Sequence, residues 1–292
     1  MADYWQLVLL LQNSLLAGAV LGVMGGLIGV FVMARDMPFA VHGISELTFA
    51  GGAAGLLFGI GVVPGSLIGS LLAAAVIGLL GEKARNRNSI VAVLMPFGLG
   101  LGILFLALYP GRSVNKFGLL TGQIVAVADQ QVLVVVVLAL AVILALLLIW
   151  RPLLFASVDA HVAASRGVPL RALSLGFMLL LGLSVAVTVQ IVGALLVLAL
   201  LVTPAAAALK LSSSPVLVPI LAMVFGVISM VGGILLALPW AIPVSPFITT
   251  LSFVIYLLAW AVGALRDRSA TSGVTATTPQ LAGTRSPAGG ER

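Results

Sequence analysis

Long apolar runs, separated by short breaks that contain polar residues, glycine or proline, dominate the chain up to about residue 265. Several runs reach the roughly 20 residues that a helix needs to cross the hydrocarbon core of a bilayer. The pattern therefore predicts an all-α, polytopic transmembrane protein with about nine spans. We expect these spans at residues 7–33, 39–63, 67–80, 90–109, 132–150, 172–209 (divided into two near Gln190), 216–238 and 247–265.

Two of these boundaries depend on local signals. Pro64 and Gly65 predict a tight turn between the second and third spans. Residues 172–209 are too long for one crossing and short for two, so we divide them near Gln190 with almost no loop. Without that division the chain has eight spans.

Composition agrees with the pattern and excludes some functions. Of the 292 residues 62% are hydrophobic and 8% are charged, whereas soluble domains carry roughly 25% charged residues. The chain has no cysteine, which excludes disulfides and thiolate metal sites.

The net charge of +6 arises from basic residues in short loops between apolar runs. This is the distribution of the positive-inside rule and not of a nucleic-acid-binding patch, so we expect no nucleic-acid partner. Nine spans with an outside N-terminus place most basic residues in the cytoplasm and leave only Arg112 and Lys116 outside. We therefore expect a multi-pass protein of the bacterial plasma membrane with a cytoplasmic C-terminus.

The last part of the chain changes composition. Residues 1–266 form the predicted transmembrane domain, and residues 267–292 are rich in Ser, Thr, Gly and Pro. Such a segment has too little apolar surface to offset the entropy of ordering it. We expect a disordered cytoplasmic tail.

Glycine pairs with three residues between them recur along the predicted spans. Small residues at this spacing allow helices to approach closely in lipid, so we expect these pairs to pack helices. They are Gly18/Gly22, Gly25/Gly29, Gly51/Gly55, Gly65/Gly69 and Gly98/Gly102.

His42 and Glu46 are ionisable residues inside the second predicted span. They follow Arg35 by seven and eleven residues, which places them about 10–17 Å deep in a helix. Their four-residue spacing puts both side chains on one face. Nitrogen and carboxylate donors suit a zinc, manganese or iron ion. A self-neutralising pair that only packs helices, and a proton relay, are the alternatives.

The stretch "MPFAVHGISELTFAGGAAG" around this pair resembles the second-span region of the metal-ion permeases of ABC transporters. That family's usual pattern is Gly-Asp-Ala-Leu-Ser-His-Ala followed by small residues. His42 stands at the family's Asp, Glu46 at its His, and Ser45 at the intervening Ser. The resemblance thus implies that both ligand positions are kept, with the nitrogen and oxygen donors in reversed order.

Three further stretches resemble the same family in the same order along the chain. They are "RNRNSIVAVLMPFGLGLGILF", "SVDAHVAASRGVPLRAL" and "VQIVGALLVLALLVTPAAAA". The resemblance implies the ABC importer permease fold and ATP-driven import of a divalent metal ion, with zinc favoured and manganese or iron possible. It also implies two copies of the chain around one pathway, two ATP-binding subunits and an extracytoplasmic solute-binding protein.

The chain has no Gly-x-x-x-x-Gly-Lys-Ser/Thr phosphate loop, so ATP hydrolysis is expected in a separate subunit and the chain itself is not an enzyme. The longest cytoplasmic connection, residues 155–171, is the predicted contact with that subunit. Asp159, His161 and Ser165 lie in a short predicted helix that Gly167 and Pro169 end. His161 is a weak candidate metal ligand.

Further candidates are weaker. Asp36 and Gln190 are possible polar groups along the pathway, although Asp36 can instead pair with Arg35. The connections 109–129 and 239–246 are expected to receive the solute-binding protein. Two other functions stay open at this point: an ABC permease for a metal chelate such as haem or a siderophore, and an ion-coupled secondary transporter. No resident cofactor is expected, because the metal ion is the cargo.

Overall fold

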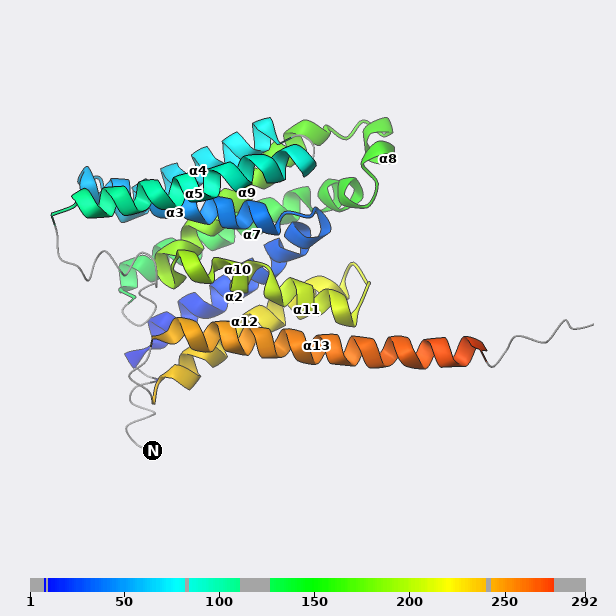
Figure 1. The fold of residues 1–292 in the computed structure, drawn as a ribbon. Coiled ribbons are helices and arrows are strands. Elements are labelled where there is room, and N and C mark those ends of the chain that lie inside the picture. Colours follow the sequence, from blue (N-terminus) through cyan, green and yellow to red (C-terminus); the bar gives the residue numbers. More distant parts are fainter. Residues whose placement is uncertain (1–7, 9, 82–83, 111–126, 240–242, 276–292) are drawn as a thin grey trace, which may run out of the picture.

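The computed structural model describes residue 8 and residues 10–81, 84–110, 127–239 and 243–275, and within these ranges every regular element is helical (Figure 1). This confirms the predicted all-α class. The elements are α2 (Gln12–Ala34), α3 (Pro38–Leu57), α4 (Val62–Leu80), α5 (Ala84–Leu108), α7 (Asp129–Val158), α8 (Ala160–Ser165), α9 (Leu170–Val192), the 3-10 turn η1 (Ala194–Leu196), α10 (Val197–Leu201), α11 (Thr203–Leu211), α12 (Leu217–Ala237) and α13 (Val244–Thr275).

Seven of the described helices are long and apolar enough to cross a membrane, namely α2, α4, α5, α7, α9, α12 and α13. Helix α3 has 20 residues, and the polar His42 and Glu46 lower its hydropathy. It nevertheless runs between the same two ends of the bundle as α4 and α5 (Figure 1). The broken run from η1 to α11 makes one more passage, so the described residues agree with about nine spans.

The predicted break between the sixth and seventh spans, expected near Gln190, lies at Gly193. Helix α9 ends at Val192, and Gly193 adopts a φ of 85°, which is favourable only for glycine. The following passage is not one continuous helix, because η1, α10 and α11 are separate elements. Pro204, at the start of α11, lacks the backbone donor that a continuous helix would need.

The predicted turn at Pro64 and Gly65 is wrong by several residues. Helix α3 ends at Leu57, and the turn uses Gly59 and Gly61, whose φ angles are 74° and 93°. Pro64 lies in the first turn of α4, where its missing N–H has no helical partner to lose. The position of the turn is therefore set by Gly59 and Gly61, which lie between the two helices. Pro64 instead favours the start of α4.

Three helices extend past their predicted ends. Helix α5 begins at Ala84 and α7 continues to Val158. Helix α13 continues to Thr275, beyond the predicted start of the tail at residue 267. Residues 276–292 lie outside the described residues, so their disorder stays a prediction. Most of the predicted outer connection 109–129, and Trp240 to Ile242 of the other, also lie outside them.

Close helix packing depends on the paired glycines, as predicted. A Cβ atom on Gly51 would meet the backbone of Gly65 and Gly69, and a Cβ atom on Gly55 would meet the backbone of Gly61. Helices α3 and α4 therefore touch backbone to backbone. Helices α2 and α12 pack in the same way, with Gly26 against the backbone of Ala222. Without a hydrophobic drive between helices in lipid, such contacts supply much of the association energy.

The α2–α3 turn and α8 lie at the same end of the bundle (Figure 1), and Arg35 follows α2 there while Arg171 lies in the first turn of α9. There Arg87 donates from Nη2 to the carbonyl oxygens of Arg35 at 3.1 Å and Asp36 at 2.9 Å. Arg266 donates from Nη1 to the Leu211 carbonyl at 3.0 Å and joins α13 to the end of α11. This clustering supports the predicted cytoplasmic end, although the orientation itself stays a prediction.

Candidate functional site

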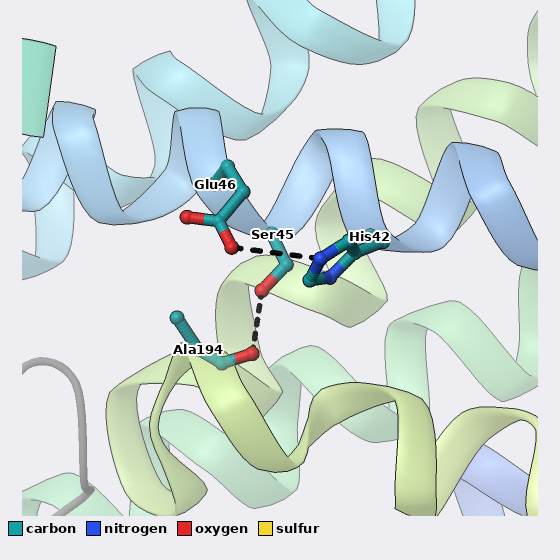
Figure 2. A network of polar contacts seen from close by, with 4 residues as sticks. All are labelled: His42, Ser45, Glu46 and Ala194. Atoms are coloured by element: carbon teal, nitrogen blue, oxygen red, sulfur yellow. Dashed lines mark hydrogen bonds and ion pairs between the residues drawn. The ribbon is translucent and has the colours of Figure 1, made fainter. Parts of the chain in front are cut away.

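His42 and Glu46 lie one turn apart on α3 and face each other, as Figure 2 shows. The distance from His42 Nε2 to Glu46 Oε1 is 3.8 Å. The His42 side chain is 31% exposed and that of Glu46 is 7% exposed. The helix thus holds a nearly buried carboxylate beside an imidazole that is still accessible from outside the chain.

The pair does not satisfy its own hydrogen-bonding groups. A distance of 3.8 Å is too long for an N–H···O hydrogen bond, which spans about 2.7–3.2 Å. His42 Nδ1 and Glu46 Oε2 are both buried and have no hydrogen-bond partner among the described residues. Buried polar groups in this state are costly and rare, which argues against a pair that only packs helices.

A single cation can bridge the two groups. Two metal–ligand bonds of about 2.1 Å reach across up to about 4.2 Å, so one ion can contact both His42 Nε2 and Glu46 Oε1. Imidazole and carboxylate together suit manganese, iron and zinc. No cluster of three or more His, Cys, Asp or Glu residues occurs within the described part of the chain, and His42 and Glu46 are the ionisable donor pair that this part brings together.

Ser45 connects the pair to the break after α9. Its hydroxyl is buried and donates to the Ala194 carbonyl oxygen at 2.8 Å (Figure 2). The Ala194 carbonyl lies just past Gly193, where the helical hydrogen-bond ladder of α9 has stopped. The bond therefore fixes α3 against η1 at the level of His42 and Glu46. The sequence offered one signal for this role, a serine between the two candidate ligands, but not its partner.

Ser45→Ala is expected to loosen this junction. The variant leaves the buried Ala194 carbonyl without the hydroxyl, and hydrogen bonds between membrane helices contribute about 0.6 kcal/mol on average. The thermal unfolding midpoint of the purified protein should fall by a few degrees. Ser184→Ala is the matched control, because the buried Ser184 hydroxyl donates to the Leu180 carbonyl of its own helix. An equal fall in both variants would contradict the role of Ser45.

Gln190 lies on α9, close in sequence to the break. Its Nε2 atom is buried and has no hydrogen-bond partner among the described residues. Helix α9 packs against α3, so a polar group that needs a partner lies on an element next to the His42 and Glu46 helix. Its role along a pathway stays a prediction.

Asp36 lies in the α2–α3 turn and not beside the pair. It is exposed and has a φ of 53°, a conformation that Asp tolerates better than most residues. Its carboxylate is attracted to the guanidinium of Arg87, and its alternative pairing with Arg35 stays a prediction. Asp36 is thus part of the link between this turn and α5, six residues before His42.

The predicted short helix between α7 and α9 is present as α8 (Ala160–Ser165). Asp159 caps it, because its Oδ1 accepts from the amides of His161 at 2.9 Å and Val162 at 3.0 Å. Gly167 follows with a φ of 82° and reverses the chain. Buried Ala163 anchors α8, whereas His161, Ser165 and most other residues of α8 are exposed.

The sequence model of the ABC 3 transport family matches residues 8–263. The chain belongs to the ABC 3 transport family. It is 30% identical over 251 residues to the manganese transport system membrane protein MntC of Halalkalibacterium halodurans, covering 86% of each chain. It is 28% identical to the manganese import system permease protein ScaB of Streptococcus parasanguinis, covering 86% of this chain and 90% of ScaB.

A solved structure shows the same fold. PsaBC from Streptococcus pneumoniae in complex with Fab superposes with a TM-score of 0.80 and 26% identity, covering 89% of this chain and 95% of the PsaBC chain. Family membership confirms the resemblance found in the sequence: the chain is a membrane permease subunit of the metal-ion ABC transporters and not an enzyme. It also sets aside the independent secondary transporter as an alternative.

Proposed function

We propose that this permease imports manganese(II) and that His42 and Glu46 bind the ion during its passage. The observation that carries the proposal is the unsatisfied imidazole–carboxylate pair on α3, with 3.8 Å between Nε2 and Oε1. An ionisable pair in a membrane helix is costly unless it faces a partner or an aqueous path. The relatives named for manganese transport support a metal cargo.

Two copies of the chain complete the site in this proposal. One copy offers one nitrogen and one carboxylate donor, and a two-fold axis next to α3 would double that set. The partial exposure of His42 supports such an arrangement, because an imidazole wholly enclosed by its own chain could not reach a second copy. A set of four donors binds an ion and still allows release when the two copies move apart.

Manganese replaces zinc as the favoured cargo. Zinc, which the sequence resemblance favoured, suits a tetrahedral set of four nitrogen and oxygen donors. Manganese accepts carboxylate, carbonyl and water oxygen readily, and the relatives described above are named for manganese. Glu46, with its unpartnered Oε2, offers such oxygen donors.

Transport by the reconstituted complex tests this function. Proteoliposomes that contain the permease, an ATP-binding subunit and a solute-binding protein should accumulate radioactive manganese only with ATP and magnesium. Excess unlabelled manganese should compete strongly, and a haem or siderophore chelate should not. Uptake without ATP, or competition by the chelate alone, would contradict the proposal.

Helix α8 is the proposed contact with the ATP-binding subunit. Exposed Val162 projects from a helix that Ala163 anchors, and α8 packs against both α7 and α9. Helix α9 leads to Gly193, and η1 beyond it contacts α3 through Ser45. A movement of α8 therefore has a packed route to the helix that carries His42 and Glu46.

Asp159→Ala is expected to weaken this coupling. The change removes the cap of α8, and such caps contribute about 1 kcal/mol, so ATP-dependent uptake should fall several-fold while manganese binding is retained. Asp159→Asn is the matched control, because asparagine caps helices equally well. Uptake and co-purification of the ATP-binding subunit are the measurements. If the alanine variant matches the wild type, the proposed role of α8 is wrong.

A further inference from the structure

The side chain of Arg35 joins the turn between α2 and α3 to helix α9. Arg35 directly follows α2, and Pro38 begins α3 three residues later. The Nη2 atom of Arg35 donates to Ser174 Oγ in α9 at 3.1 Å. Its guanidinium carbon lies 5.7 Å from the centre of the Phe177 ring, which also belongs to α9. A charge-assisted hydrogen bond and a cation–π contact therefore connect the turn with α9.

Arg87 joins the same turn to α5. It is 8% exposed, and its Nη2 atom donates to the carbonyl oxygens of Arg35 at 3.1 Å and Asp36 at 2.9 Å. Burial, and then the guanidinium of Arg87, lower the pKa of Arg35, so the two cations repel each other. The turn is thus held by α9 through the Arg35 side chain and by α5 through its backbone.

The helix that carries the ion site begins at this turn. Arg35, Asp36 and Met37 are the three residues between α2 and α3, and Met37 is buried. His42 follows Pro38 by four residues, in the second turn of α3. Because a link of three residues has little slack, a displacement of Arg35 is passed to His42 through one short stretch of helix.

Space for such a displacement exists beside α8. Arg35 and Ser174 line a hollow of about 440 Å³, and Ala160, the first residue of α8, lines it too. Helix α8 also packs against α9. Close-packed interiors have few voids and transmit strain, whereas a hollow lets neighbouring elements shift against each other. The start of α9 and the Arg35 side chain therefore have room to move when α8 moves.

We propose that Arg35 couples movements of α8 and α9 to the ion site on α3, as a second link beside the one through Ser45. The proposal rests on the transport function and on the role of α8 proposed above. When the ATP-binding subunits shift α8, the start of α9 moves and Arg35 carries the α2–α3 turn with it. His42 then changes its position relative to the second copy of the chain, and the ion is released. Arg35 is thus a positioning residue that acts through His42 and Glu46.

The ratio of manganese transported to ATP hydrolysed tests the proposal, in proteoliposomes that contain the permease, an ATP-binding subunit and a solute-binding protein. Arg35→Gln removes the charge, Ser174→Ala removes the acceptor, and Ser174→Thr keeps a hydroxyl. We expect the ratio to fall about tenfold in Arg35→Gln and about threefold in Ser174→Ala, with ATP hydrolysis retained. Ser174→Thr should keep the ratio of the wild type.

Ser157→Ala is the matched control for Ser174→Ala. Ser157 is also half-buried, but its hydroxyl donates to the Leu153 carbonyl of its own helix at 2.7 Å. The substitution should leave the ratio unchanged. A fall equal to that of Ser174→Ala would overturn the proposal, because it would show that loss of any serine hydroxyl at this end has the same effect.

The wild type separates a failure of this proposal from a failure of the transport function. Absence of ATP-dependent manganese uptake by the wild type would refute the function on which the proposal rests. If the wild type transports normally, an unchanged ratio in both Arg35→Gln and Ser174→Ala would overturn the role of Arg35 alone. Equal losses of transport and ATP hydrolysis, together with a lower unfolding midpoint, would overturn it as well, because they would assign Arg35 to the stability of the fold.

Discussion

Manganese uptake should fall to background when His42 or Glu46 is replaced by alanine. Each change removes one of the two side-chain donors that a copy of the chain supplies, and groups that merely orient a ligand already cost 10–100-fold in affinity when lost. We therefore expect losses of about 100-fold or more, measured as initial rates of radioactive manganese uptake in cells that lack their own importer.

Two further variants make this prediction specific. Thr48→Val on the same helix is the control, because the Thr48 hydroxyl donates to the Ile44 carbonyl one turn away on its own helix, and it should retain uptake. His42→Asp combined with Glu46→His keeps one oxygen and one nitrogen donor in the family's usual order, and it should retain measurable uptake. Normal uptake by both single variants, with the complex assembled, would show that the pair binds no cargo.

Gly26→Ala should destabilise the fold strongly, although it adds only one methyl group. The new Cβ would meet the Ala222 carbonyl and the Met223 amide, which are backbone atoms that can move only if α2 and α12 separate. Overpacking of this kind costs about 1–3 kcal/mol, and sometimes more. We expect a large loss of folded protein, measured by the yield of monodisperse protein after extraction and by its unfolding midpoint.

Gly100→Ala on α5 is the matched control for this change. A Cβ atom at Gly100 meets nothing within 4 Å, and alanine favours a helix interior over glycine by about 0.5–1 kcal/mol. Its stability should be unchanged or slightly higher. Comparable losses in both variants would show that glycine acts through chain flexibility and not through close helix contact.

Much of the fold could be predicted because membrane-spanning helices need long apolar runs, which are easy to recognise in a sequence. Apolar runs gave the helices, paired glycines gave their close contacts, and the Asp159 to Gly167 pattern gave α8. The turn after α3 was misplaced because Pro64 was interpreted as a turn residue, whereas proline is equally suited to the first turn of a helix. Turn position depends on φ at Gly59 and Gly61, which composition alone does not specify.

Only part of the candidate site could be predicted from the sequence. The spacing of His42 and Glu46 places them on one face because a helix repeats every 3.6 residues. The contact between Ser45 and the Ala194 carbonyl joins positions 149 residues apart, and no local pattern records such a pairing. Arg87 falls between the expected spans 67–80 and 90–109, but in the structure it is a buried donor to the α2–α3 turn.

Pulsed electron paramagnetic resonance of manganese(II) in the assembled, nucleotide-free complex tests the central claim most directly. The electron spin of the ion should couple to an imidazole nitrogen in the wild type, because His42 Nε2 is a ligand. That nitrogen coupling should disappear in His42→Ala and persist in Thr48→Val. A bound ion with no nitrogen coupling in the wild type, or with the same coupling in His42→Ala, would contradict the account.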